Sequence, residues 1–86
     1  MDKKQISNLI QDCIRESLSK NFSENDIYKL HFKKTREWDS ISHIRLMACL
    51  RSKFNINFTF EEMVNMTNFA EIFRVISTQI ANEASE

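Results

Sequence analysis

The chain has 86 residues, which is enough for one hydrophobic core and too few for two. It contains no glycine and no proline, which excludes glycine-rich phosphate-binding loops and leaves helices free to run unbroken. Twelve basic and twelve acidic side chains cancel, so the overall charge does not demand a nucleic-acid partner. We therefore predict a single all-α domain over residues 1–86. No apolar run reaches the length of a signal peptide or a membrane span, so we expect a cytoplasmic protein that does not enter a membrane.

The first predicted helix covers residues 3–20. Its apolar side chains recur at helical spacing and share one face, namely Ile6, Leu9, Ile10, Cys13, Ile14 and Leu18. Residues 21–38 follow as a long connection, with room for one short helical turn near 24–29. Connections of this length in small domains are often functional.

The next helix is predicted from Asp39, a good N-cap, to Phe54. Its apolar residues form two stripes on opposite faces: Leu46, Met47, Leu50 and Phe54 on one, and Ile41, Ile44 and Ala48 on the other. The second stripe has two interpretations, which are burial against the long loop and contact with a partner. Asn55 suits the left-handed position that ends many helices.

Two capping patterns predict the remaining elements. Thr59 and Glu62 form a capping box before a short helix over residues 60–65, with Met63 and Met66 as apolar contacts. Asn68 and Glu71 repeat the pattern before a long helix whose apolar face holds Phe69, Ile72, Phe73, Ile76 and Ile80. The polar tail 82–86 is expected to fray. The predicted architecture is a small four-helix bundle, three long helices and one short, with a long loop between the first two.

Nothing in the sequence resembles a catalytic or metal site. The two cysteines, Cys13 and Cys49, lack metal-ligand spacing, and we expect them to be reduced core or near-core residues. His31 and His43 also lack metal-ligand spacing. Ser40 and His43 could touch across one helical turn, but so small a bundle offers little pocket for hydrolysis. We therefore expect a protein that is not an enzyme.

The charges are unevenly placed along the chain. Residues 29–53 carry seven basic and two acidic side chains, whereas residues 54–86 carry one basic and five acidic ones. The basic stretch is either a solvated face or a surface for a charge-complementary partner. A nucleic-acid binder is disfavoured, because the helix has no polar base-reading face and Ile41 and Ile44 lie where phosphates would sit.

The motif Asp39-Ser40-Ile41 resembles the Asp-Ser-Leu attachment motif of acyl carrier proteins and related peptidyl carriers. Leu46, Leu50 and Phe54 fall at the core spacing of that family, and Phe54-Asn55-Ile56 is similar to its Phe-Gly-Ile helix end. Residues 59–66 resemble its short third helix, and residues 68–71 the start of its last helix. The likeness covers residues 38–80 without a gap, and the first helix and long loop agree in layout.

This resemblance implies a role for each matching residue. Ser40 would carry 4′-phosphopantetheine, added from coenzyme A by a separate Mg²⁺-dependent phosphopantetheinyl transferase. Asp39 would help position the transferase metal, and Met63 would flank the arm. Ile41, Ile44 and Ala48 would contact partner enzymes or the acyl chain. The terminal thiol would hold an acyl or aminoacyl group as a thioester for activating and transferring enzymes, and the carrier is expected to be a monomer.

Trp38 before Asp-Ser is common in stand-alone carriers of secondary-metabolite and polyketide-like systems. The sequence departs from the family in its second helix, which is usually acidic and here carries Arg45, Arg51 and Lys53. If the chain is a carrier, this departure from the family implies a partner that is acidic or apolar where it meets Arg45 and Arg51. Two alternatives stay open: a helical interaction module without a prosthetic group, and a silent carrier relative that serves as a subunit of a complex.

Overall fold

The computed structural model describes residues 1–84, which form three long helices and two short ones and, over that range, no strand. The helices are α1 (Lys3–Leu18), α2 (Glu24–Ile27), α3 (Ser40–Phe54), α4 (Phe60–Asn65) and α5 (Phe69–Ala84). The all-α prediction is confirmed, and the short helical turn expected in the first connection is α2. Helix α1 ends two residues earlier than predicted, at a left-handed Ser19 with φ 55°.

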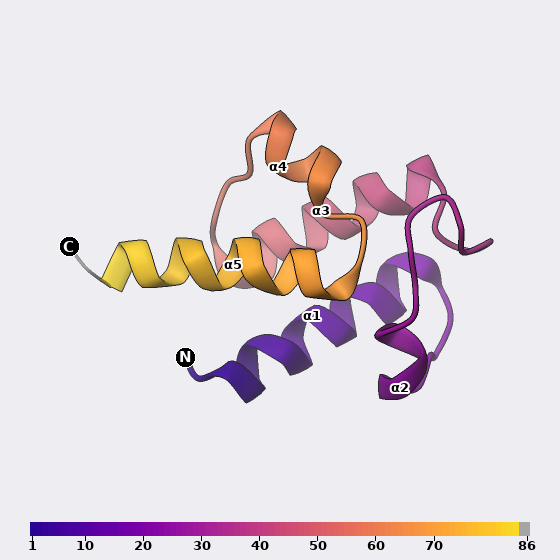
Figure 1. Ribbon diagram of the computed structural model, residues 1–86, viewed down its shortest axis with the longest axis horizontal. Helices are drawn as coiled ribbons and strands as arrows, with labels where there is room; N and C mark the ends of the chain where they lie inside the picture. The colour runs from indigo at the N-terminus through magenta and orange to yellow at the C-terminus, as the bar shows by residue number, and fades with distance from the viewer. Residues whose placement is uncertain (85–86) are drawn as a thin grey trace.

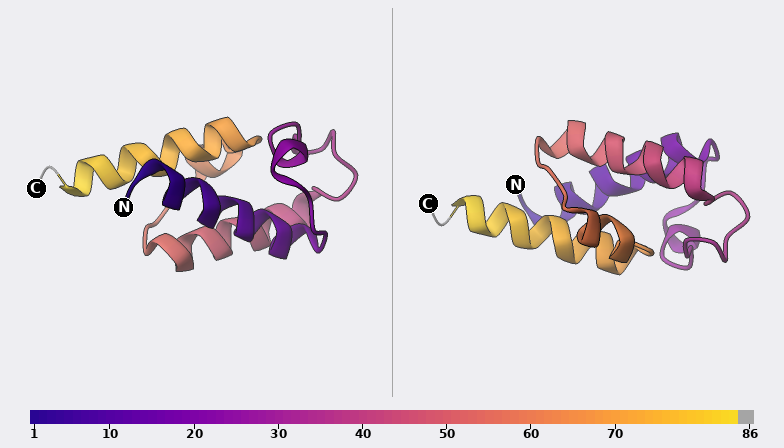
Figure 2. Two further views of the ribbon diagram at one scale, coloured as in Figure 1. Left: turned by 90° about the horizontal axis from the view of Figure 1, so that it is seen from below. Right: turned by 90° about the horizontal axis from the view of Figure 1, so that it is seen from above.

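The long helices form the body of the molecule, and α4 lies on its own side of it. In Figure 1, α1 lies below and α4 above, with α3 and α5 between them. The two views of Figure 2 agree, because α1 faces the viewer from below and α4 faces the viewer from above. Helix α1 packs against both α3 and α5. One face of α3 therefore meets α1, while another is turned toward α4.

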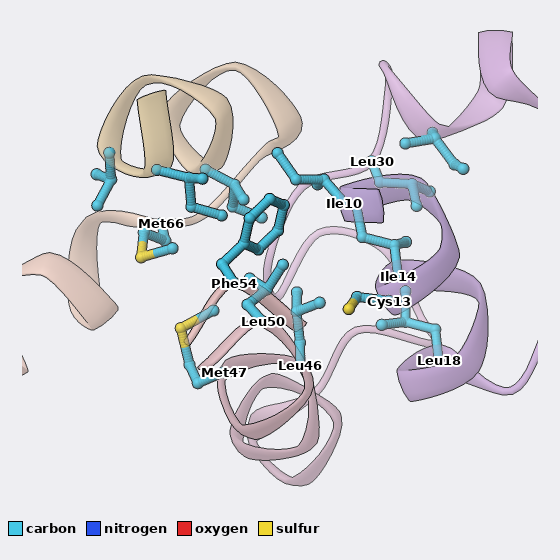
Figure 3. Packing of buried hydrophobic residues seen from close by; sticks show 14 of the residues in the cluster. Ile10, Cys13, Ile14, Leu18, Leu30, Leu46, Met47, Leu50, Phe54 and Met66 are labelled. Atoms are coloured by element: carbon cyan, nitrogen blue, oxygen red, sulfur yellow. The ribbon is translucent and has the colours of Figure 1, made fainter. Parts of the chain in front are cut away.

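The core is built from the predicted apolar faces. Ile10 and Ile14 of α1, Leu46 and Leu50 of α3 and Ile76 of α5 are fully buried, and Figure 3 shows the first four of these packed together. Side chains of this size contribute about 1.5–3 kcal/mol each when removed from water. Val75 is also buried, a residue that the predicted face of the last helix did not include.

Polar groups close the helix ends as the sequence predicts. The Asp39 carboxylate accepts a hydrogen bond from the Ser42 N–H at 2.9 Å, and Asn55 ends α3 in the left-handed region with φ 54°. Thr59 and Glu62 form the predicted capping box at α4. Only half of the pattern at α5 forms: Asn68 accepts from the Glu71 N–H at 2.9 Å, whereas the Glu71 carboxylate pairs with Arg74 at 2.9 Å.

The connection between α1 and α3 is fixed to the body at several points. Arg15 Nε donates to the Phe22 carbonyl at 2.7 Å, and the Phe32 N–H donates to the Thr67 carbonyl at 2.9 Å. Trp38 is fully buried. The long loop thus has a defined path that leads directly to the start of α3.

The cysteines occupy the expected positions in and beside the core. Cys13 is buried and Cys49 half-buried, and both are free thiols. Burial raises the pKa of the Cys13 thiol, and a hydrogen bond with Cys49 raises it further. At the C-terminus, α5 continues through residue 84, beyond the point where fraying was expected to begin, and residues 85–86 lie outside the described part of the chain.

Candidate functional site

A groove of about 570 Å³ lies between α3 and the segment that leads into and forms α4. Apolar side chains from both walls and from the long loop line most of it, namely Phe32, Ile44, Met47, Ala48, Phe58, Phe60, Met63 and Val64. Ser40, His43, Asn57 and two cations, Lys33 and Arg51, complete the lining. The groove is therefore apolar inside, with a hydroxyl and a cation at the end where α3 begins.

Ser40 is the first residue of α3 and is exposed. Its position follows from the cap, because Asp39 holds the backbone extended just before the helix with φ −94° and ψ −174°. The hydrogen bond from the Ser42 N–H lowers the pKa of the Asp39 carboxyl, which keeps this group ionised beside the hydroxyl. Among the described residues, no group forms a hydrogen bond with the Ser40 hydroxyl.

His43 lies one turn further along α3 and joins three parts of the chain. Its Nδ1 accepts a hydrogen bond from Trp38 Nε1 at 3.0 Å, and its Nε2 lies 2.8 Å from the Met63 carbonyl. Since the indole can only donate and the carbonyl only accept, the ring is neutral with its proton on Nε2. Burial lowers the pKa of His43, although the bond to Met63 opposes this.

In this geometry His43 is not placed to act as a general base for Ser40. Both His43 nitrogens are occupied by partners other than Ser40. The ring also stacks on Phe32, with ring centroids 4.4 Å apart and the planes 9° from parallel. His43 therefore acts as a structural tie between the loop, α3 and α4.

The second apolar stripe of α3 is exposed to solvent. Ile41 and Ile44 have 64% and 69% of their surface exposed, and Ala48 is exposed as well. Burial of this stripe against the long loop, one of the two interpretations of the sequence, is wrong. The apolar residues of that loop reach the core by other routes: Phe22, Ile27 and Leu30 are buried in the main cluster.

Two apolar side chains of α4 extend this surface. Phe60 is 79% exposed and Val64 is 51% exposed, and both line the groove opposite Ile44. Neither residue was predicted from the sequence to have a role. Their signal is the i, i+4 spacing, which places both side chains on one face of this very short helix.

Loop residue Lys33 carries unusual backbone geometry beside Ser40. Its φ is 68°, in the left-handed region that disfavours residues with a Cβ, and its N–H donates to the Trp38 carbonyl at 3.1 Å. The other two residues with positive φ, Ser19 and Asn55, end helices. Lys33 ends no helix, and it places a cation at the groove end that holds Ser40.

The groove brings together some of the residues that the sequence singled out. Ser40, Ile44, Ala48, Arg51 and Met63 all line it. Asp39, Ile41 and Arg45 do not line it, although Asp39 and Ile41 flank Ser40 along the chain. Lys53 lies toward α1, where its charge lowers the pKa of Cys13, and so it belongs to a different face from Arg51.

Comparisons with known proteins add no assignment. No protein-family model, curated protein or solved structure matches the chain. Within residues 1–84 no cluster of three or more His, Cys, Asp or Glu side chains could hold a metal ion. Over the same residues, every helix is too short or too polar to cross a membrane.

Proposed function

We propose that this protein is an acyl carrier protein whose Ser40 hydroxyl is the attachment point for 4′-phosphopantetheine. One observation carries the proposal: an exposed serine, directly after an Asp N-cap and without a hydrogen-bond partner in residues 1–84, lines an apolar groove where α3 begins. The arrangement of three long helices and a short α4, with a long first connection, agrees with the acyl-carrier-like bundle that the sequence resembles.

The residues around Ser40 fit a phosphodiester. The first turn of α3 presents backbone N–H groups and the positive end of the helix dipole to a group on that hydroxyl. Lys33, whose N–H donates to the Trp38 carbonyl just before the Asp39 cap, brings a cation to the groove lining, over the ring of Phe32. The ionised Asp39 carboxylate stands next to the hydroxyl and is placed to help position the metal ion of a transferase.

The arm supplies a flexible tether with a terminal thiol, to which an acyl or aminoacyl group is bound as a thioester. The chain itself presents the arm and its cargo to other enzymes and shelters them from solvent. Met63, Met47 and Phe58 line the same groove as Ser40 and offer an apolar wall to an arm or its cargo. His43 holds that wall in place through its bond to the Met63 carbonyl.

The surroundings of this site support a carrier that serves several enzymes. The partners in this proposal are a phosphopantetheinyl transferase and the enzymes that activate and transfer the acyl or aminoacyl group. The Trp38-Asp39-Ser40 motif favours a secondary-metabolite or polyketide-like pathway, and the basic side chains of Arg45, Arg51 and Lys53 argue against the common fatty-acid synthase partners. The carrier itself catalyses no step.

The test is the intact mass of the protein after incubation with coenzyme A, Mg²⁺ and a broad-specificity phosphopantetheinyl transferase. The expected result is a gain of one phosphopantetheinyl group that is lost in Ser40→Ala. Ser52→Ala is the matched control, because Ser52 is also an exposed serine of α3 but lies at its other end. Absence of any gain with several transferases, in protein that is shown to be folded, would refute the attachment and favour an interaction module without a prosthetic group.

A further inference from the structure

Exposed apolar side chains of α3 and α4 line the groove, and Ile41 adds to them outside it. We call Ile41, Ile44, Ala48, Phe60 and Val64 the docking patch. Four of these are among the six large hydrophobic residues that are most exposed in the described chain. Clustered exposed apolar residues of this kind mark interaction surfaces, whereas single ones do not.

Cargo inside the groove would leave much of the docking patch uncovered. Ile41 does not line the groove, and Phe60 keeps 79% of its surface exposed while contributing to its edge. A chain lying between Met47, Phe58 and Met63 would not reach the outer surfaces of these residues. The patch therefore needs an occupant larger than a chain held in the groove.

Two arginines flank the patch on α3. At 100° per residue, Arg51 lies on one side of the stripe formed by Ile41, Ile44 and Ala48, and Arg45 lies on the other. The six-residue separation places their Cα atoms about 9 Å apart along the helix axis. Both residues are exposed, and neither forms a hydrogen bond or ion pair within residues 1–84.

No neighbouring carboxylate of the described residues forms an ion pair with either arginine. The charge of Arg45 is the smallest of the effects that lower the pKa of Asp39, which caps α3, and Glu37 pairs with Lys20 at 3.1 Å. Glu61 and Glu62 of α4 line a separate depression shared with α5, away from the groove. The groove lining itself contains two cations and no carboxylate. The positive charge beside the docking patch is thus available to a partner.

We propose that the docking patch binds an acidic protein surface, in which an apolar protrusion covers Ile44 and Phe60 and flanking carboxylates meet Arg45 and Arg51. Charge complementarity selects this partner, because a basic surface would bring unpaired like charges together around the apolar contact. The patch exists in the unmodified chain. That its partner acts on a group carried by Ser40 rests on the proposed function.

The test uses three synthetic helical peptides with the same apolar face and with flanking positions occupied by Glu, Gln or Lys. Each is titrated into ¹⁵N-labelled unmodified protein at low and at raised salt, and binding is followed by amide chemical shifts. We expect the Glu peptide to shift the amides of α3 and α4 and to bind about fivefold more tightly than the Gln peptide, the effect of two exposed charge pairs. The Lys peptide should bind most weakly, and raised salt should reduce the differences.

Two double variants locate the effect. Arg45→Gln with Arg51→Gln should remove the preference for the Glu peptide, whereas Lys3→Gln with Lys4→Gln, the same charge change at the start of α1, should keep it. Ile44→Ser with Phe60→Ser should weaken all three peptides. Both sets change exposed residues, so an unchanged amide spectrum far from the substitutions shows that the fold is retained.

Equal or tighter binding of the Lys peptide would overturn the proposal, as would the absence of binding by any of the three peptides. Vesicles containing phosphatidylserine provide a second arm. If they shift the same amides and the Glu peptide does not, the patch binds an anionic membrane surface and the protein partner is excluded. None of these measurements needs a modified Ser40, so failure here and failure of phosphopantetheinylation are separate results.

Discussion

Helix α3 carries two apolar stripes, of which one is buried and the other is exposed. Leu46 and Leu50 are fully buried on a helix that packs against α1, whereas Ile41 and Ile44 are about two-thirds exposed. The residue types are nearly the same, so hydrophobicity alone does not distinguish the two faces. The difference lies in the neighbours: α1 covers one face along its length, while the opposite face has only the short α4 beside it. The comparison shows that a helix can bury one apolar face in the core and leave the other exposed.

The largest expected effect is a difference in the free energy of unfolding between substitutions in the buried stripe and in the exposed stripe. Leu46→Ala should lower the free energy of unfolding by about 2–5 kcal/mol, because it leaves a cavity at a fully buried site. Ile44→Ala should change it by about 0.5 kcal/mol or less, since Ile44 is already in contact with water. Chemical denaturation of both variants measures the contrast. Equal losses would mean that the two faces are equally important to the fold.

A smaller effect on stability is expected from His43, whose hydrogen bonds join Trp38 of the loop to Met63 of α4. The pKa of His43 is lowered below its ordinary value of 6.5 by burial. As pH falls below about 6.5, the unfolded chain takes up a proton that folded His43 does not. Stability should then decrease by up to about 1.4 kcal/mol per pH unit until the lowered folded pKa is reached.

Denaturation between pH 7 and pH 5 measures this slope, and a range above the usual titration of carboxyl groups keeps their contribution small. His43→Gln is the matched control, because a glutamine can accept from Trp38 and donate to Met63 without titrating. Its stability should be nearly flat over the same range. A slope that survives the substitution would assign the pH dependence to other groups.

The smallest expected effect concerns the strained backbone beside Ser40. Lys33→Gly should raise the free energy of unfolding by about 1 kcal/mol, because glycine adopts the left-handed conformation at φ 68° without the Cβ clash. The gain is reduced by the greater freedom of glycine in the unfolded chain. Lys34→Gly, at a neighbouring loop residue with negative φ, should destabilise and provides the control. Destabilisation by Lys33→Gly would mean that its side chain, including its contact over the Phe32 ring at 5.6 Å, stabilises the loop more than the strain opposes it.

Local patterns in the sequence predicted most of the fold. Apolar periodicity located α1, α3 and α5, and the capping residues Asp39, Thr59 and Asn68 placed helix starts within a residue of where the structure has them. These signals work because a cap and a helical stripe depend only on neighbours a few positions away. For the same reason, the sequence placed Ser40 at the start of α3 and Met63 on α4.

Contacts between distant segments were beyond the reach of such patterns. The sequence left open whether Ile41 and Ile44 are buried, because the answer depends on where the long loop runs. It did not predict that Trp38 and His43 join the loop to α4, and it missed Phe60 and Val64 as lining residues of the groove. Each of these depends on tertiary packing, which single-residue spacing does not encode.

The short helix α4, which forms one wall of the groove, is held to the body by few contacts, and this determines how often it opens. None of the residues of α4 is buried, and its ties to the body include the His43–Met63 bond at 2.8 Å and contacts of Gln79 with Glu62 at 3.4 and 3.5 Å. A segment with so few buried apolar contacts opens at a much lower free energy than the long helices, which open only with the whole molecule. The width of the groove can therefore change by local opening of α4 while the long helices stay folded, and amide exchange at residues 60–65 should be the fastest of any helix outside the termini.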